Sequence, residues 1–201
     1  LLEMLQAGFR ATDFGLAMVI ADALLDRFED PADGGFFFTS HDHERLILRP
    51  KPGHDNATPS GNGIAALALT RLGHLSGEPR YLAAATRTLE LFYPILSRQP
   101  AGFATLCTAL AEILEPTQTV VLRAPGAVPP DWLRALAACY LPDTLIIAPE
   151  PQASGLPPTL GKPAGDTVNA YVCRGVNCLM PIGSVEELLK TLENRPIIQA
   201  V

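Results

Sequence analysis

The chain has 201 residues, of which 48% are hydrophobic and 18% charged, and its formal net charge is −6. This composition is typical of a folded protein with a buried core and excludes disorder over most of the length. The acidic balance argues against a nucleic-acid partner, which needs a basic face. No apolar run approaches the roughly 20 residues that a membrane span requires. We therefore expect a cytoplasmic protein with no membrane partner.

The first residues indicate that the chain is part of something longer. They have no charged segment before an apolar core, so they do not resemble a secretory signal. Their apolar spacing is that of the end of an amphipathic helix whose start signal is absent; the residues are Leu1, Leu2, Leu5 and Phe9. We expect a missing N-terminal part of the same protein to be one of its partners.

Four helices are predicted in the first part of the chain. The first is capped by Thr12-Asp13 and stopped at Asp33-Gly34-Gly35, and the second starts at Thr58-Pro59-Ser60. A third follows Gly77-Glu78-Pro79 and a fourth covers about residues 103–114. The first two are apolar around most of their circumference, whereas the third has a single apolar stripe.

This alternation is what concentric inner and outer layers of helical hairpins require. For residues 1–117 we predict a mainly α fold that is part of an (α/α) toroid, with a solenoid or bundle as the alternative. About four helices cannot close such a ring. Either the missing N-terminal part completes it, or a second copy of the chain covers the exposed apolar faces.

A β-hairpin is expected between the first two helices. Residues 36–39 and 45–48 are short β-type runs joined by a polar tip, and Pro50 ends the second run because proline cannot donate to a ladder. The tip contains His41 and His43, which would point to opposite sides of an extended strand. A solvated turn is therefore favoured over a metal site, and no metal is expected.

Residues 118–201 are predicted to form a small α/β unit. Strands near 120–122, 144–148 and 167–173 alternate with helices at 130–140 and after the capping box Ser184-x-x-Glu187. Such alternation predicts a small, largely parallel sheet. No glycine-rich phosphate loop joins a strand to a helix, so no cofactor is expected.

The four cysteines are too few and too scattered for a disulfide framework, which favours a reducing compartment. They are Cys107, Cys139, Cys173 and Cys178. The last two are separated by four residues, not by the two residues of a C-x-x-C redox motif. Two ordinary thiols in a strand-end turn are the favoured interpretation, with a redox or metal role as the alternative.

The candidate site is the polar segment 49–62, which converges on a helix start suited to a sugar hydroxyl or an anion. Asp55 is the candidate catalytic residue, as acid, base or hydrogen-bond acceptor, and Arg49 and Lys51 would polarise an oxygen or keep the carboxylate ionised. Ser60 and Asn62 complete the candidate ligand-binding set. The alternative is a salt-bridged loop with an ordinary helix cap.

Several of these motifs resemble the YyaL-like family, the spermatogenesis-associated, thioredoxin-domain-containing group. The resemblance covers nearly the whole chain, although Asn56 stands where the family usually has glycine. The residues that carry it are Gly34–Thr39, Arg49-Pro50-Lys51, Asp55 with Ala57–Asn62, Gly77–Tyr81, Ala170–Cys173 and Cys178-x-x-Pro181.

The resemblance implies a thioredoxin-like domain followed by an (α/α)6 toroid similar to N-acylglucosamine 2-epimerases and six-hairpin glycosidases. This chain would hold the last hairpins and a C-terminal α/β appendage. The paired catalytic histidines of the epimerases have no counterpart here.

Two functions are expected from these observations. The first is a carbohydrate-active or sugar-binding toroid with the candidate site at its mouth, taking a sugar-like small molecule. The second is a non-catalytic scaffold that packs against the thioredoxin-like domain or another protein. The scaffold is the alternative because glycoside hydrolysis ordinarily needs two carboxylates, and Asp55 is the single candidate.

Overall fold

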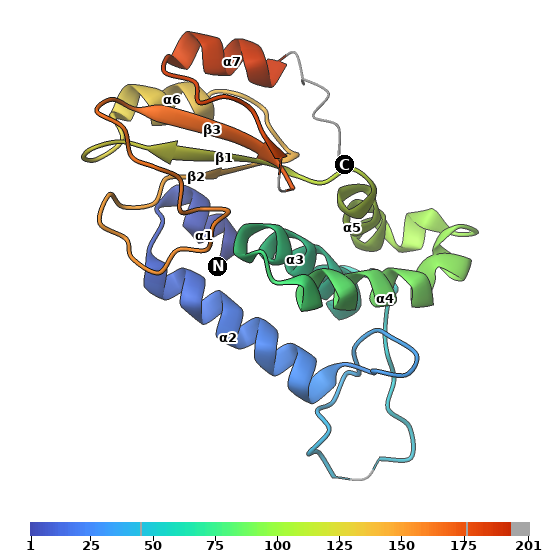
Figure 1. Ribbon diagram of the computed structural model, residues 1–201. Coiled ribbons are helices and arrows are strands. Elements are labelled where there is room, and N and C mark those ends of the chain that lie inside the picture. Colours follow the sequence, from blue (N-terminus) through green and yellow to red (C-terminus); the bar gives the residue numbers. More distant parts are fainter. Residues whose placement is uncertain (45, 176, 194–201) are drawn as a thin grey trace. The chain divides into compact units, whose positions relative to one another are not determined.

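The computed structural model describes residues 1–44, 46–175 and 177–193 (Figure 1). These residues form two compact units. The helical unit is Gly15–Glu115, and the sheet unit combines Leu1–Phe14 with the described residues from Pro116 onward. Residues 1–14 are predicted from the sequence to belong to the helical part, whereas the structure groups them with the sheet unit.

The helical unit contains most of α2 (Ala11–Phe28), then α3 (Gly61–Ser76), α4 (Pro79–Leu96), the short 3-10 helix η1 (Pro100–Gly102) and α5 (Ala104–Leu114). The predicted start of α3 is confirmed, because the Ser60 hydroxyl accepts a 3.1 Å hydrogen bond from the Gly63 amide. The helix ends at Gly77, whose φ of 75° favours glycine.

Helix α3 packs against both α4 and α5, and the three share an apolar core. Gly73 allows close approach to α4, since a Cβ there would lie 2.7 Å from the Leu82 side chain. An Arg71–Glu112 ion pair of 2.7 Å also joins α3 to α5. The buried core residues are Ala66, Leu89, Leu96, Phe103, Leu106 and Ala109.

Helix α2 is less buried than its sequence predicts. Leu16, Val19 and Ile20 are 48%, 63% and 54% exposed. Apolar residues around a helix signal burial only when neighbours exist on every side, and α2 has an uncovered apolar stripe at i, i+3 and i+4.

The predicted β-hairpin at 36–48 is wrong for the described residues of that range, where the structure has no strand and only a single bridge between Phe36 and Glu29. The segment is held along the end of α2 instead: the Phe37 amide donates to the Phe28 carbonyl (2.9 Å). The Phe38 amide donates to the Pro50 carbonyl (2.9 Å). Because Pro50 has no N–H to return, this pairing cannot extend into a ladder.

The sheet unit contains α1 (Leu2–Ala7), β1 (Gln118–Arg123), α6 (Pro130–Ala137), β2 (Thr144–Ile147), β3 (Asn169–Arg174), β4 (Asn177–Cys178) and α7 (Val185–Glu193). The sheet order is β2-β1-β3-β4. Only β1 and β2 are parallel, so the prediction of a largely parallel sheet is wrong. Helix α6 provides the crossover that parallel strands need, whereas no helix separates β2 from β3.

The core of the sheet unit is mainly aliphatic, with one tryptophan, and lies where α6 and α7 cover one face of the sheet (Figure 1). Alternate residues of β1 and β3 point to these helices, as the two-residue period of a strand requires. The predicted capping box is confirmed in part, since the Ser184 hydroxyl accepts from the Glu187 amide at 3.2 Å. The core residues are Val120, Leu122, Trp132, Leu136, Ala170, Val172, Ile182, Leu188 and Leu192.

The chain is thus mainly α with a small mixed sheet. Over its described residues, no helix combines the length and apolar character needed to cross a membrane.

Candidate functional site

The polar segment 49–62 lies between the long loop after α2 and the start of α3, entirely within the helical unit. Within this segment, Asp55 bonds to two helices. One carboxylate oxygen accepts from the Ser60 amide and the other from the Thr105 amide, both at 2.8 Å. Asp55 therefore holds the N-terminal ends of two helices, α3 and α5, at once.

The pKa of the Asp55 carboxyl is lowered from its ordinary value of 3.8. Burial by itself raises this pKa, but the hydrogen bonds from Thr105 and Ser60 favour the ionised form and together outweigh it. A carboxylate held ionised with both oxygens engaged is a poor general acid, because it has little tendency to carry a proton.

Asn62 is 2% exposed and uses its amide to bind the backbone of two distant segments. Its Oδ1 accepts from the Phe36 amide (2.6 Å), and its Nδ2 donates to the carbonyls of Phe36 and Pro52 (both 2.9 Å). The side chain thus supplies Phe36 with the reciprocal pair of hydrogen bonds that a neighbouring strand would have given.

Lys51 and Arg49 serve the same loop. The Lys51 ammonium donates to the Asp30 carboxylate (2.8 Å) and to the Gly34 carbonyl (2.9 Å). Arg49 donates to the Thr39 carbonyl (2.7 Å), and its guanidinium lies 4.0 Å from the centroid of the Phe37 ring. The hydrogen bond from Lys51 is the main cause that lowers the pKa of Asp30, opposed by burial of that carboxyl.

A surface cavity of about 410 Å³ adjoins this motif. Ser60 and Asn62 are among its lining residues, whereas Arg49, Lys51 and Asp55 are not. Its walls combine an aromatic run with amide, hydroxyl and imidazole groups; the full lining is Leu24, Phe36, Phe37, Phe38, Pro52, His54, Asn56, Thr58, Pro59, Ser60, Gly61 and Asn62.

The sequence predicts residues 36–38 as part of a strand, so their role as aromatic walls of this cavity was not expected. Phe38 is 73% exposed, although a phenylalanine in a strand is usually buried. The proximity of an aromatic run to the polar segment was the available signal. His54 packs edge-on to Phe103, with ring centroids 5.4 Å apart, and so presents its ring at the cavity rim.

The two histidines of the long loop have partners within the chain. His41 Nε2 lies 3.0 Å from the Glu29 carbonyl, and its Nδ1 lies 3.3 Å from the Arg49 guanidinium. Within the residues that the structure describes, no cluster of three histidine, cysteine or acidic residues is arranged to hold a metal ion.

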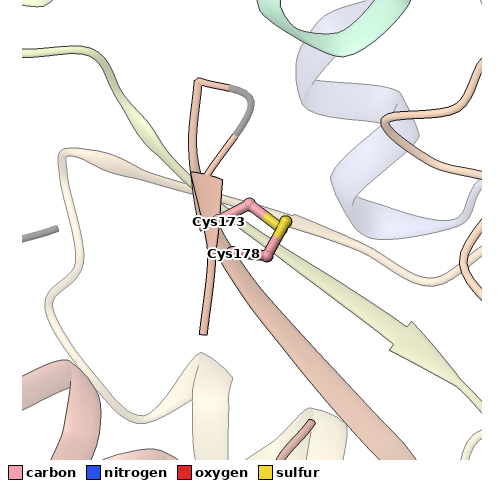
Figure 2. Close-up of a disulfide and its surroundings, with 2 residues drawn as sticks. All are labelled: Cys173 and Cys178. Atoms are coloured by element: carbon pink, nitrogen blue, oxygen red, sulfur yellow. A yellow bond between two sulfur atoms is a disulfide. The ribbon is translucent and has the colours of Figure 1, made fainter. Parts of the chain in front are cut away.

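A feature of the sheet unit corrects the sequence analysis. Cys173 and Cys178 are joined by a disulfide, so they are not two ordinary thiols (Figure 2). The five-residue separation is longer than that of a C-x-x-C redox motif, but it suits directly opposed positions of a two-strand hairpin, and β4 brings them together. Cys107 and Cys139 are free.

Taken by fold and site, the chain combines a unit of packed helical hairpins, which carries a surface cavity beside a capped loop, with a small mixed α/β unit. No protein-family model matches it. It is similar over 96% of its length to spermatogenesis-associated protein 20 of Homo sapiens, Mus musculus and Rattus norvegicus, with identities of 27%, 25% and 26%. These matches confirm the resemblance drawn from the motifs. The chain spans about a quarter of the length of these relatives.

Proposed function

We propose that the helical unit binds a sugar-like small molecule in the cavity between residues 36–38 and the start of α3. The observation that carries this proposal is the composition of the cavity. Aromatic rings from Phe36–Phe38 share it with the exposed polar residues His54, Asn56 and Thr58. A sugar presents an apolar face of C–H groups and a rim of hydroxyls, which suits a wall of each kind.

The volume of about 410 Å³ falls in the range of small-molecule pockets. Gly61 adds room at the start of α3, because no atom lies within 4 Å of the Cβ that another residue would have there. The first-turn amides of α3 also favour ligand oxygens. In this proposal Asp55 is a positioning residue: it holds the loop 56–59 against α3 and α5 and does not react.

We further propose that the helical unit is part of a toroid completed by other segments of a longer protein, in the cytoplasm. Three observations support this arrangement: nine of the sixteen residues of α3 are buried, α4 is amphipathic, and α2 has an uncovered apolar stripe.

The second candidate function is the non-catalytic scaffold. It is favoured by one observation: each of the five predicted site residues already bonds to the chain itself. A motif that holds loops to helices needs no ligand to explain it.

Calorimetric titration of the purified protein with neutral and charged mono- and disaccharides distinguishes the two. The Phe38→Ala variant should bind a responsive sugar at least ten-fold more weakly, because the exposed ring supplies stacking area. Leu48→Ala is the matched control, since Leu48 is 75% exposed and does not line the cavity. An equal loss of sugar affinity in both variants, or no saturable binding of any sugar, would favour the non-catalytic scaffold instead.

A further inference from the structure

The edge of the sheet carries a feature that sugar binding does not use. Strand β4 is two residues long and pairs antiparallel with β3, so that Cys173 faces Cys178 and Arg174 faces Asn177. The disulfide joins the first of these two pairs across the end of the sheet (Figure 2).

The two sulfur-bearing residues differ in access. Cys173 is 5% exposed, whereas Cys178 is exposed on the edge strand. Its surroundings are open: Gly175 is exposed with no atom within 4 Å of an added Cβ, and Met180 is 83% exposed. Attack on a disulfide needs a thiolate to reach one sulfur, so approach from solvent favours the sulfur of Cys178.

Backbone hydrogen bonds hold the same edge of the sheet independently of this bond. The chain after Cys178 is held to β3 by three backbone hydrogen bonds: Leu179 amide to Val172 carbonyl (2.9 Å), Ala170 amide to Ile182 carbonyl (2.9 Å) and Ile182 amide to Ala170 carbonyl (3.0 Å). The disulfide spans a separation of only five residues, so it removes less entropy from the unfolded chain than a bridge that closes a long loop. These three hydrogen bonds do not involve the disulfide and would remain if it were broken.

Three observations support a redox role: Cys178 is exposed, it lies directly opposite Cys173, and other hydrogen bonds hold the same edge. We propose that Cys173–Cys178 is a thiol–disulfide exchange site for a dithiol reductant, which attacks the sulfur of Cys178. The partner thiolate forms a bond to Cys178 Sγ, the Cys173–Cys178 bond breaks, and Cys173 Sγ leaves as a thiolate that takes up a proton. The second partner thiol then attacks the mixed disulfide. Cys178 Sγ leaves as a thiolate that takes up the proton lost by the second partner thiol, the partner becomes a disulfide, and two electrons have passed to this chain.

Exchange is also compatible with the cytoplasmic location proposed above, which is a reducing compartment. In such a compartment a lasting structural disulfide is rare, and those that occur are usually transient or redox-sensing. The inference stands apart from sugar binding, because every residue it uses belongs to the sheet unit.

The first test measures whether the folded protein exchanges. A Cys107→Ser, Cys139→Ser variant is equilibrated at pH 7 without denaturant in buffers with different ratios of reduced to oxidised glutathione. The samples are quenched with acid and alkylated, and the mass of the protein is measured by mass spectrometry. The Cys173–Cys178 pair should pass from oxidised to reduced within the accessible range of ratios, with unchanged far-ultraviolet circular dichroism. If the variant fails to fold, peptide mapping of the wild-type chain gives the same measurement.

The second test locates the attack. A dithiol oxidoreductase that lacks its resolving cysteine should form a persistent mixed disulfide, found by peptide mapping on Cys178 at least five-fold more often than on Cys173. Three results would overturn the proposal: a bond that resists millimolar reduced glutathione until urea is added, an adduct mainly on Cys173, or two free thiols even in oxidised glutathione.

Discussion

The two units of this chain hold their irregular segments in different ways. In the helical unit, polar side chains bind distant backbone: the buried Asn62 holds Phe36 and Pro52, and the half-buried Asp55 holds the starts of α3 and α5. In the sheet unit, strand ladders and an apolar core hold the fold together. The buried Arg123 donates to the carbonyls of the loop after β2.

This difference between the units shows where polar side chains are needed to hold the fold. Loops between helices leave backbone amides and carbonyls without partners, and a buried group of this kind costs as much as a lost hydrogen bond. A sheet pairs most of its backbone internally, so fewer side chains are needed. Polar substitutions should therefore be costlier in the helical unit than in the sheet unit.

The largest expected effect is that of Asn62→Ala. The change leaves the buried amide and carbonyl of Phe36 and the carbonyl of Pro52 without this partner, and should lower the free energy of unfolding by about 4 kcal/mol. Urea denaturation measures the loss. The matched control is Asn56→Ala, an exposed asparagine of the same motif. A change below about 1 kcal/mol for Asn62→Ala would break the comparison.

Asp55→Asn should cost about 2.5 kcal/mol at pH 7, because one of two helix-start amides loses a charged acceptor. The pKa of Asp55 is lowered in the folded protein. Its contribution to stability is therefore present above the ordinary pKa and is lost as the pH falls through the lower, folded value.

Urea denaturation between pH 7 and pH 3 should show the gap between wild type and Asp55→Asn narrowing below about pH 4. Asp33→Asn, at an exposed position of the turn after α2, serves as the control and should leave stability within about 0.5 kcal/mol. A gap that stays constant over this pH range would count against the capping role of the Asp55 carboxylate.

The smallest expected effect is in the sheet unit. Arg123 is 6% exposed, but two of its three carbonyl partners belong to the exposed residues Glu150 and Pro151, where water can replace the guanidinium. Arg123→Met should therefore cost about 1 kcal/mol in urea denaturation. Arg134→Met, an exposed arginine on α6, controls for loss of charge. A loss for Arg123→Met as large as that of Asn62→Ala would show that the sheet unit also depends on buried polar contacts.

Local signals predicted most elements. The start of α3 at Ser60, its stop at Gly77 and the helix after Pro79 were readable, because capping oxygens, left-handed glycines and first-turn prolines act within a few residues. The strands β1, β2 and β3 followed from short apolar runs between turn signals.

The pairing of strands and the hydrogen-bond partners of the loops could not be predicted from such local signals. Residues 36–39 have strand-like composition, yet Asn62, 26 positions further on from Phe36, takes both hydrogen-bonding groups of that residue. The hydrogen bonds of Asp55 were not readable either: its carboxylate accepts from two helix starts, one of them 50 residues away. A disulfide between Cys173 and Cys178 depends on the two-residue strand β4, which is too short for any periodic signal.

The sequence by itself determined the mainly helical character of residues 15–115, the position of the polar motif and the likeness to the spermatogenesis-associated proteins. Only the tertiary structure decided the mixed order of the sheet, the cavity beside Phe38, the bonding of Asp55 and the pairing of Cys173 with Cys178. The physical reason is range: caps, turns and apolar periods act over a few neighbouring residues, whereas strand pairing and buried hydrogen bonds join groups that are distant in the chain.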